Sequence, residues 1–154
     1  MGGTIIESER RLPYPARDLC LLVGDVKSYP RFIPWIKALR VIEETREGDG
    51  WRGVAQATVG WKTLLERFST HVRCDPAAGE VDVRLSDGPF KRLENKWRFS
   101  NAPEGGHAIV RFWIAYEFRN PVLQALVKVN REHAAGRIME AFEQEAARRF
   151  TPSA

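Results

Sequence analysis

Titratable side chains are the first place to look for chemistry in this sequence, because acid–base and metal catalysis both need such groups close together. The chain has three histidines, which are His71, His107 and His133. They fall on separate predicted elements, and no cysteine or carboxylate stands at a metal-ligand spacing from them. Glu66 is the best candidate general acid or base, since alternation places it on the inward face of a strand. We favour the simpler reading of a rim residue paired with Arg67 or Arg98.

Other catalytic motifs are absent from the sequence. Residues 48–50 and 88–90 are glycine-containing turns between strands, and neither opens a helix as a phosphate-binding loop would. No serine has the context of a nucleophile elbow. Cys20 and Cys74 are expected to be reduced and partly buried, because the chain begins without the basic and apolar regions of a signal peptide. We therefore expect a non-enzymatic protein with no metal and no cofactor.

The elements that would position a binding site follow from the turn residues. Residues 4–11 alternate as a first strand, and Pro15 opens a short helix that Gly24 ends. Asp25 caps a second helical turn, followed by a stiff hydrophobic corner at residues 29–35 rather than a regular element. Six further strands are predicted, at residues 38–45, 51–59, 63–74, 80–85, 90–99 and 106–118. Short turns between them favour an antiparallel sheet.

The C-terminal segment predicts a long helix. Asn120 is a good N-cap and Pro121 suits the first helical position. The helix would run for about 29 residues, roughly 43 Å at 1.5 Å per residue. With 154 residues, the chain is expected to form one α+β domain, residues 1–154, with its helices on one face of the sheet.

Apolar side chains share one face of the last two predicted strands, as in Trp97 and Phe112, and they form either a plain core or the wall of a cavity. The predicted helix opposite has only small side chains at residues 134–136. Glycine at position 136 costs about 1 kcal/mol relative to alanine. Small size there indicates either a close approach of the helix to the sheet or unfilled volume, and composition leaves both open. An apolar cavity would indicate an apolar ligand.

Four segments in order along the chain carry a resemblance to a known family. They are residues 25–35 with Tyr29-Pro30 and Pro34-Trp35, residues 88–97 with Gly88-Pro89-Phe90-Lys91, residues 112–118, and residues 141–143. Together they resemble the coenzyme-Q-binding branch of the START-like, polyketide-cyclase-like superfamily. The resemblance implies a helix-grip fold, in which an antiparallel sheet of about seven strands wraps around the C-terminal helix, with two short helices after the first strand.

The resemblance also implies a tunnel that binds a lipid, most simply ubiquinone, in support of respiration. Carried over by position, Phe32 and Trp35 would form a lid beside the opening. The complete set of implied ligand-binding residues is Phe32, Trp35, Leu64, Phe68, Leu93, Trp97, Phe112, Tyr116, Ile138 and Phe142. The ribosome-association toxin belongs to the same branch and shares these motifs. Ribosome binding is therefore the alternative function, and a polyketide cyclase using Glu66 is the third.

The net charge of +4 permits contact with an anionic membrane or with RNA and requires neither. Basic residues surround the predicted lid, namely Lys27, Arg31, Lys37 and Arg40. They either bring the lid to an anionic bilayer, at about 1 kcal/mol each, or form an ordinary solvated rim. We expect a cytoplasmic monomer, which would make transient contact with the inner membrane if the first of these readings holds.

Overall fold

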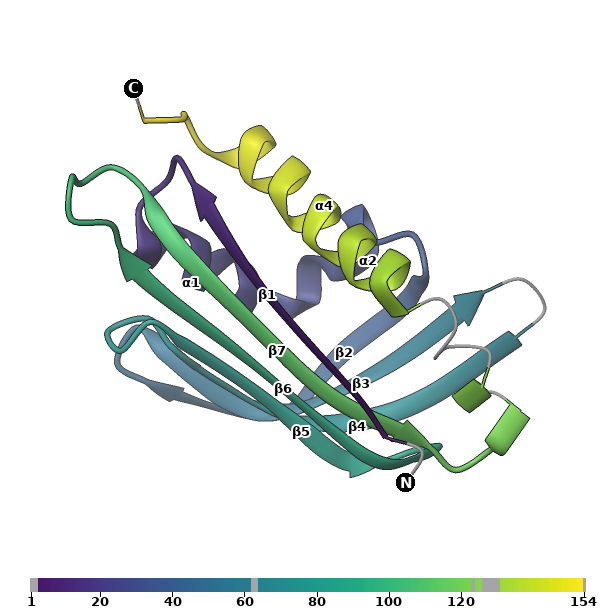
Figure 1. Ribbon diagram of the computed structural model, residues 1–154. Coiled ribbons are helices and arrows are strands. Elements are labelled where there is room, and N and C mark those ends of the chain that lie inside the picture. Colours follow the sequence, from purple (N-terminus) through teal and green to yellow (C-terminus); the bar gives the residue numbers. More distant parts are fainter. Residues whose placement is uncertain (1–2, 62–63, 123, 126–130, 154) are drawn as a thin grey trace.

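The fold is a single antiparallel sheet with all described helices on one face (Figure 1). The computed structural model describes residues 3–61, 64–122, 124–125 and 131–153. The seven strands lie in the order β1-β7-β6-β5-β4-β3-β2. They are β1 (Thr4–Leu12), β2 (Ile36–Glu47), β3 (Gly50–Trp61), β4 (Leu64–Asp75), β5 (Glu80–Asp87), β6 (Phe90–Asn101) and β7 (Ala108–Phe118). The α+β class and the predicted antiparallel sheet are confirmed.

The helices follow the predicted order, with one correction. Their bounds are α1 (Ala16–Gly24), η1 (Val26–Ser28), α2 (Tyr29–Phe32) and α4 (Arg131–Arg149). The corner at residues 29–35 was expected to lack regular structure, but its first four residues form a helical turn. Pro30 lies in the first turn, where its missing N–H costs no hydrogen bond.

The C-terminal helix is described over 19 residues, as α4. Residues 121–122 and 124–125 are helical as well, and Val122 N–H donates to Asn120 Oδ1 at 2.9 Å, which confirms the predicted cap. The predicted continuous length of about 29 residues includes positions 126–130, which lie outside the described residues. That length stays a prediction.

Strand register determines which side chains share a face. Trp97 lies opposite Phe112, and Leu93 lies opposite Tyr116. Because side chains alternate along a strand, these four residues point to the same, inner face. The predicted apolar faces of β6 and β7 are therefore correct, and the intervening charged residues point outward.

The main core lies between the inner face and helices α1, α2 and α4. We call it the helix cluster, and its buried members include Leu22, Trp97, Phe112, Met139 and Phe142. Among the described residues, a Cβ added at Gly136 of α4 would meet nothing within 4 Å, which argues against a close approach of the helix to the sheet. The other reading, unfilled volume between helix and sheet, stays a prediction.

Candidate ligand-binding face

A second apolar cluster occupies the other part of the inner face. We call it the sheet cluster: Phe90, Leu93 and Tyr116 are buried in it, and the partly buried members are Ile6, Phe68, Leu85, Ile114 and Phe118. All eight side chains come from strands, and no described helical residue belongs to the cluster. Figure 1 shows the start of β1 and the end of β7, where part of this cluster lies, away from α4. The sheet cluster is therefore an apolar part of the inner face whose described members all come from strands.

Aromatic rings give the sheet cluster a defined shape. Phe90 stacks on Phe118 with ring centroids 4.6 Å apart, and Phe68 meets Phe90 edge-on at 5.3 Å. Tyr116 contacts Phe118 at 5.9 Å. Such contacts hold the rings in fixed positions. Ile114 belongs to both clusters, so the apolar surface continues from the sheet cluster into the helix cluster.

The helix cluster is a densely packed core around Phe142. The Phe142 ring lies edge-on to Trp97 at 5.1 Å, to Tyr29 at 5.3 Å and to Phe32 at 5.4 Å. The Tyr29 hydroxyl donates to the Val23 carbonyl, and burial raises the pKa of this tyrosine far above its ordinary value. These contacts fix α2 against α4 and indicate a structural role for this part of the inner face.

Polar side chains on the inner face are satisfied internally. Asn95 Oδ1 accepts from Trp97 Nε1 at 2.8 Å, and Asn95 Nδ2 donates to the Trp113 carbonyl at 3.0 Å. Gln124 accepts from the Phe118 N–H at 2.9 Å and donates to Thr4 Oγ1 at 3.2 Å. Because these groups have partners, the face offers mostly apolar contact to a ligand.

The ten predicted ligand residues divide between the two clusters. Phe68, Leu93 and Tyr116 belong to the sheet cluster. Six others belong to or pack against the helix cluster, namely Phe32, Trp35, Trp97, Phe112, Ile138 and Phe142. The side chain of Leu64 lies outside the described residues. Sequence reasoning missed Phe90, Phe118, Leu85 and Ile6 as lining residues, although strand alternation places all four on the inner face.

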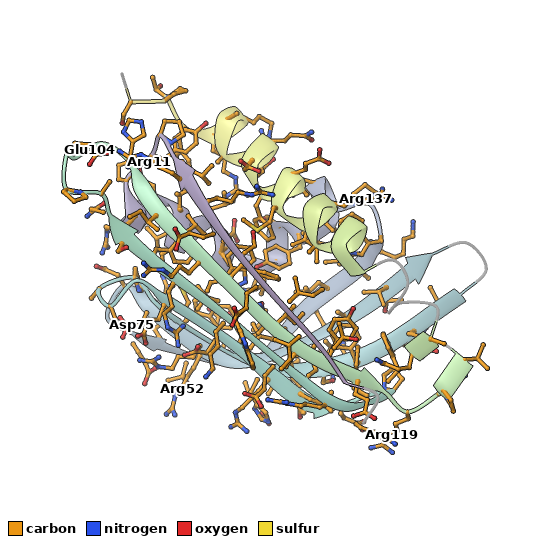
Figure 2. All side chains as sticks on the ribbon, viewed as in Figure 1. Arg11, Arg52, Asp75, Glu104, Arg119 and Arg137 are labelled. Atoms are coloured by element: carbon orange, nitrogen blue, oxygen red, sulfur yellow. The ribbon has the colours of Figure 1, made fainter. Side chains whose placement is uncertain are left out.

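The predicted lid is a real corner of the structure. Trp35 is half-buried against the helix cluster, and the Arg137 guanidinium of α4 lies over its ring at 5.5 Å. Figure 2 shows Arg137 on α4, at the outer edge of the molecule. A cation over an aromatic ring contributes about 0.5–1 kcal/mol at an exposed site. This contact is one of several that join the corner to α4.

The basic residues around the lid have different surroundings. Lys27 forms an ion pair with Glu44 at 2.8 Å, and Arg40 donates to Gln56 at 2.6 Å. Lys37 donates to the Pro34 carbonyl at 3.0 Å. Arg31 is exposed and forms no ion pair with any described residue. Lys27 therefore brings less net charge to a membrane than the sequence implied.

The candidate catalytic groups do not assemble into a site. Glu66 is half-buried, and its predicted pairing with Arg98 is wrong, because Arg98 pairs with Asp82 at 2.9 Å on the outer face. Cys20 and Cys74 are free and buried. Their mutual hydrogen bond raises the pKa of the Cys20 thiol, as does burial, and lowers that of Cys74. Among the described residues, no group of three potential ligands could hold a metal ion.

Two clefts lie away from the sheet cluster. One, of about 220 Å³, lies between the α1–η1 junction and strands β2 and β3. The other is a groove of about 650 Å³ on the outer face. None of the predicted ligand residues lines either cleft. In the described part of the chain, no helix has the length and apolar character to cross a bilayer.

Comparison with known proteins places the chain in one family. The family model for polyketide cyclase/dehydrase and lipid transport proteins matches residues 12–143. The chain belongs to this family. A START superfamily protein from Mycobacterium smegmatis has the same fold, with a TM-score of 0.78 at 19% identity over 94% of this chain and 97% of its own.

Sequence relatives with different names cover most of the chain. The ribosome association toxin RatA of Pseudomonas aeruginosa is 34% identical over 94% of this chain and 96% of its own length. The mitochondrial coenzyme Q-binding protein coq10 of Schizosaccharomyces pombe is 31% identical over 90% and 84%. A solution structure of an 18 kDa Caulobacter crescentus protein is 40% identical, with a TM-score of 0.76 over 94% and 97%. The predicted family membership is confirmed.

Proposed function

We propose that the protein binds an isoprenoid quinone, most simply ubiquinone, on the inner face of its sheet, without catalysing a reaction on it. The observation that carries this proposal is the sheet cluster, in which eight apolar side chains from five strands form one continuous part of the inner face. Similarity to a protein named for coenzyme Q binding supports the same ligand class. The ligand tail would lie along Phe68, Leu93 and Tyr116.

The energetics of such a ligand suit the surface. Each buried methylene contributes about 0.8 kcal/mol. A polyisoprenoid tail therefore gains affinity with length until the apolar surface is filled. The sheet cluster ends at Ile114, which also packs against the helix cluster, so the filled core there limits the length of tail that can be buried.

Mass spectrometry of organic extracts from the purified native protein tests the proposal. Wild-type protein should release an isoprenoid quinone in stoichiometric amount. Phe68→Asp places a charge in the sheet cluster and should abolish the bound lipid. Leu65→Asp is the matched control, because Leu65 neighbours this region on the outer face of the same strand and is 60% exposed. The control should retain the lipid.

Two results would overturn the quinone proposal. One is a wild-type extract free of lipid, and the other is equal lipid loss in both aspartate variants. Circular dichroism establishes that each variant is folded. If Phe68→Asp fails to fold, Phe68→Ala replaces it, and a lipid content equal to that of wild type would then count against the proposal.

Association with the large ribosomal subunit is the second candidate function. Similarity to a ribosome association toxin over 94% of this chain favours it. Sedimentation with purified subunits tests it, and binding should weaken steeply with added salt if RNA phosphates are contacted. Lipid-free protein that co-sediments would make ribosome association the primary function.

A further inference from the structure

The outer groove is a second potential site, separate from the inner face. It spans strands β3 to β6, and five Arg or Lys side chains and three Asp or Glu side chains line it. The charged and titratable residues involved are Arg52, His71, Arg73, Asp82, Arg84, Glu94, Lys96, Arg98 and, on the β2 rim, Glu43. Figure 2 shows Arg52 projecting from the side of the sheet away from α4. Helices and groove therefore lie on opposite faces.

Part of this charge is neutralised within the sheet. Arg73 pairs with Asp75 at 3.0 Å and lies within 3.5 Å of Asp82. Arg98 pairs with the same Asp82 at 2.9 Å and with Glu80 at 3.7 Å. These two arginines are bound by acidic neighbours, so they hold the strands together and offer little to a ligand.

The remaining cations of the groove are held less tightly by acidic side chains. Arg84 and Lys96 are exposed and form no ion pair with any described residue. Glu94 lies beside Arg84 in the register, but it forms an ion pair with Arg92, at 3.4 Å. Arg52 has only a loose pair with Glu47, at 3.5 Å. Among the residues that line the groove, Glu43 included, five cations face three carboxylates, and Arg84 and Lys96 are the cations outside any ion pair with a described residue.

An aromatic ring continues this surface on the next strand. Trp113 of β7 lies opposite Lys96 in the register, and its half-buried ring has the Lys96 ammonium at 5.4 Å and the Arg92 guanidinium at 5.9 Å. From β3 to β7 the surface spans four strand spacings of about 4.8 Å, roughly 19 Å in all. Cations beside an aromatic ring on an open sheet suit a ligand that carries both phosphates and bases.

We propose that this outer groove binds single-stranded RNA, with Arg84 and Lys96 on backbone phosphates and Trp113 stacked on a base. A recessed groove admits a linear polyanion, whereas the flat surface of an anionic bilayer would not reach its floor at Val54. The inference deepens the second candidate function, on which it rests, by naming the surface and the chemistry of the partner. It leaves the inner face free, so lipid and RNA could bind together.

Fluorescence anisotropy with a labelled oligouridylate tests the groove at several salt concentrations. If Arg52, Arg84 and Lys96 each neutralise one phosphate, the plot of log affinity against log salt should have a slope of about −2. Arg84→Glu with Lys96→Glu should weaken binding by at least about tenfold and reduce the slope toward −0.7. Trp113→Ala should weaken binding without changing the slope.

Arg31→Glu is the matched control, because it reverses an exposed, unpaired charge at the lid instead of the groove. It should bind RNA as wild type does. The proposal would be overturned if the Arg84→Glu, Lys96→Glu protein bound RNA as tightly as wild type. It would also be overturned if Arg31→Glu weakened RNA binding as much as the double substitution does. If the Arg84→Glu, Lys96→Glu protein binds RNA as wild type does but no longer binds vesicles of equimolar phosphatidylcholine and phosphatidylglycerol, the groove is a membrane-binding site instead. Bound lipid, extracted from the same variants, reports separately on the inner face.

Discussion

Glu145 provides a direct test of how α4 is held against the rest of the fold. Its side chain is 4% exposed and accepts hydrogen bonds from Arg148 at 2.5 and 2.9 Å and from Arg149 at 2.7 Å. Arg149 continues to Asp25 at 3.2 Å and to Ser28 Oγ at 2.9 Å. This network connects the end of α4 to the α1–η1 junction, so replacing Glu145 should loosen the helix that covers the core.

The size and the pH dependence of this loss of stability follow from the pKa of the Glu145 carboxyl group. Hydrogen bonds from Arg148 and then Arg149 lower the pKa of Glu145 from 4.5 to about 2. A depressed folded-state pKa stabilises the protein above the unfolded value, and that stability is lost as pH falls from about 4.5 to 2. If the whole pKa shift acted on stability, the Glu145 carboxylate would contribute about 3 kcal/mol to the free energy of unfolding at neutral pH. Because Arg148 is 68% exposed, solvent screening reduces this to about 1–2 kcal/mol.

Urea unfolding followed by tryptophan fluorescence measures this contribution across a pH series. Glu145→Gln should lower the free energy of unfolding at neutral pH by about 1–2 kcal/mol and should flatten its decline below pH 4.5. Glu140→Gln is the control, since Glu140 is exposed on the same helix without an ion pair among the described residues. A Glu145→Gln protein as stable as wild type at neutral pH, or one with an unchanged acid decline, would refute the reasoning.

Three further predictions concern packing. Gly24→Ala should lower the free energy of unfolding by about 1–3 kcal/mol, because the new Cβ would lie 2.3 Å from Cys74 Sγ. Gly136→Ala should raise it by about 0.5–1 kcal/mol, because no described atom lies within 4 Å of the new Cβ. Thermal unfolding measures both. Phe142→Ala should cost about 3–5 kcal/mol, and a loss under 1 kcal/mol in urea unfolding would contradict its central packing. Cys20 and Cys74 should resist a thiol reagent until the protein unfolds, and rapid labelling of native protein would contradict their burial.

The strands and helices were predictable because their signals are local. Alternation along residues 106–118 identified β7, and Pro15 with Gly24 identified α1 to within a residue. The corner at Tyr29 was misjudged because proline in a first turn is compatible with a helix. Local patterns determine such elements without knowledge of their neighbours.

The candidate site was less predictable because it depends on what packs against each face. Alternation gave the inward direction of Phe68 and Leu93, but it could not reveal that side chains from β1, β4, β5, β6 and β7 meet in one cluster. The partner of Arg98 depends on the register between β5 and β6, which sequence does not supply. For the same reason the outer groove, built from four strands, left no signal in any single segment.

Titration of delipidated protein with quinones of increasing isoprenoid length tests the central claim most directly. If the tail lies along the sheet cluster, affinity should rise with each added isoprene unit, at up to about 0.8 kcal/mol per buried methylene, and then level off when the surface is filled. Phe68→Asp should abolish the rise, and Leu65→Asp should preserve it. An affinity independent of tail length, equal in both variants, would contradict quinone binding on the inner face.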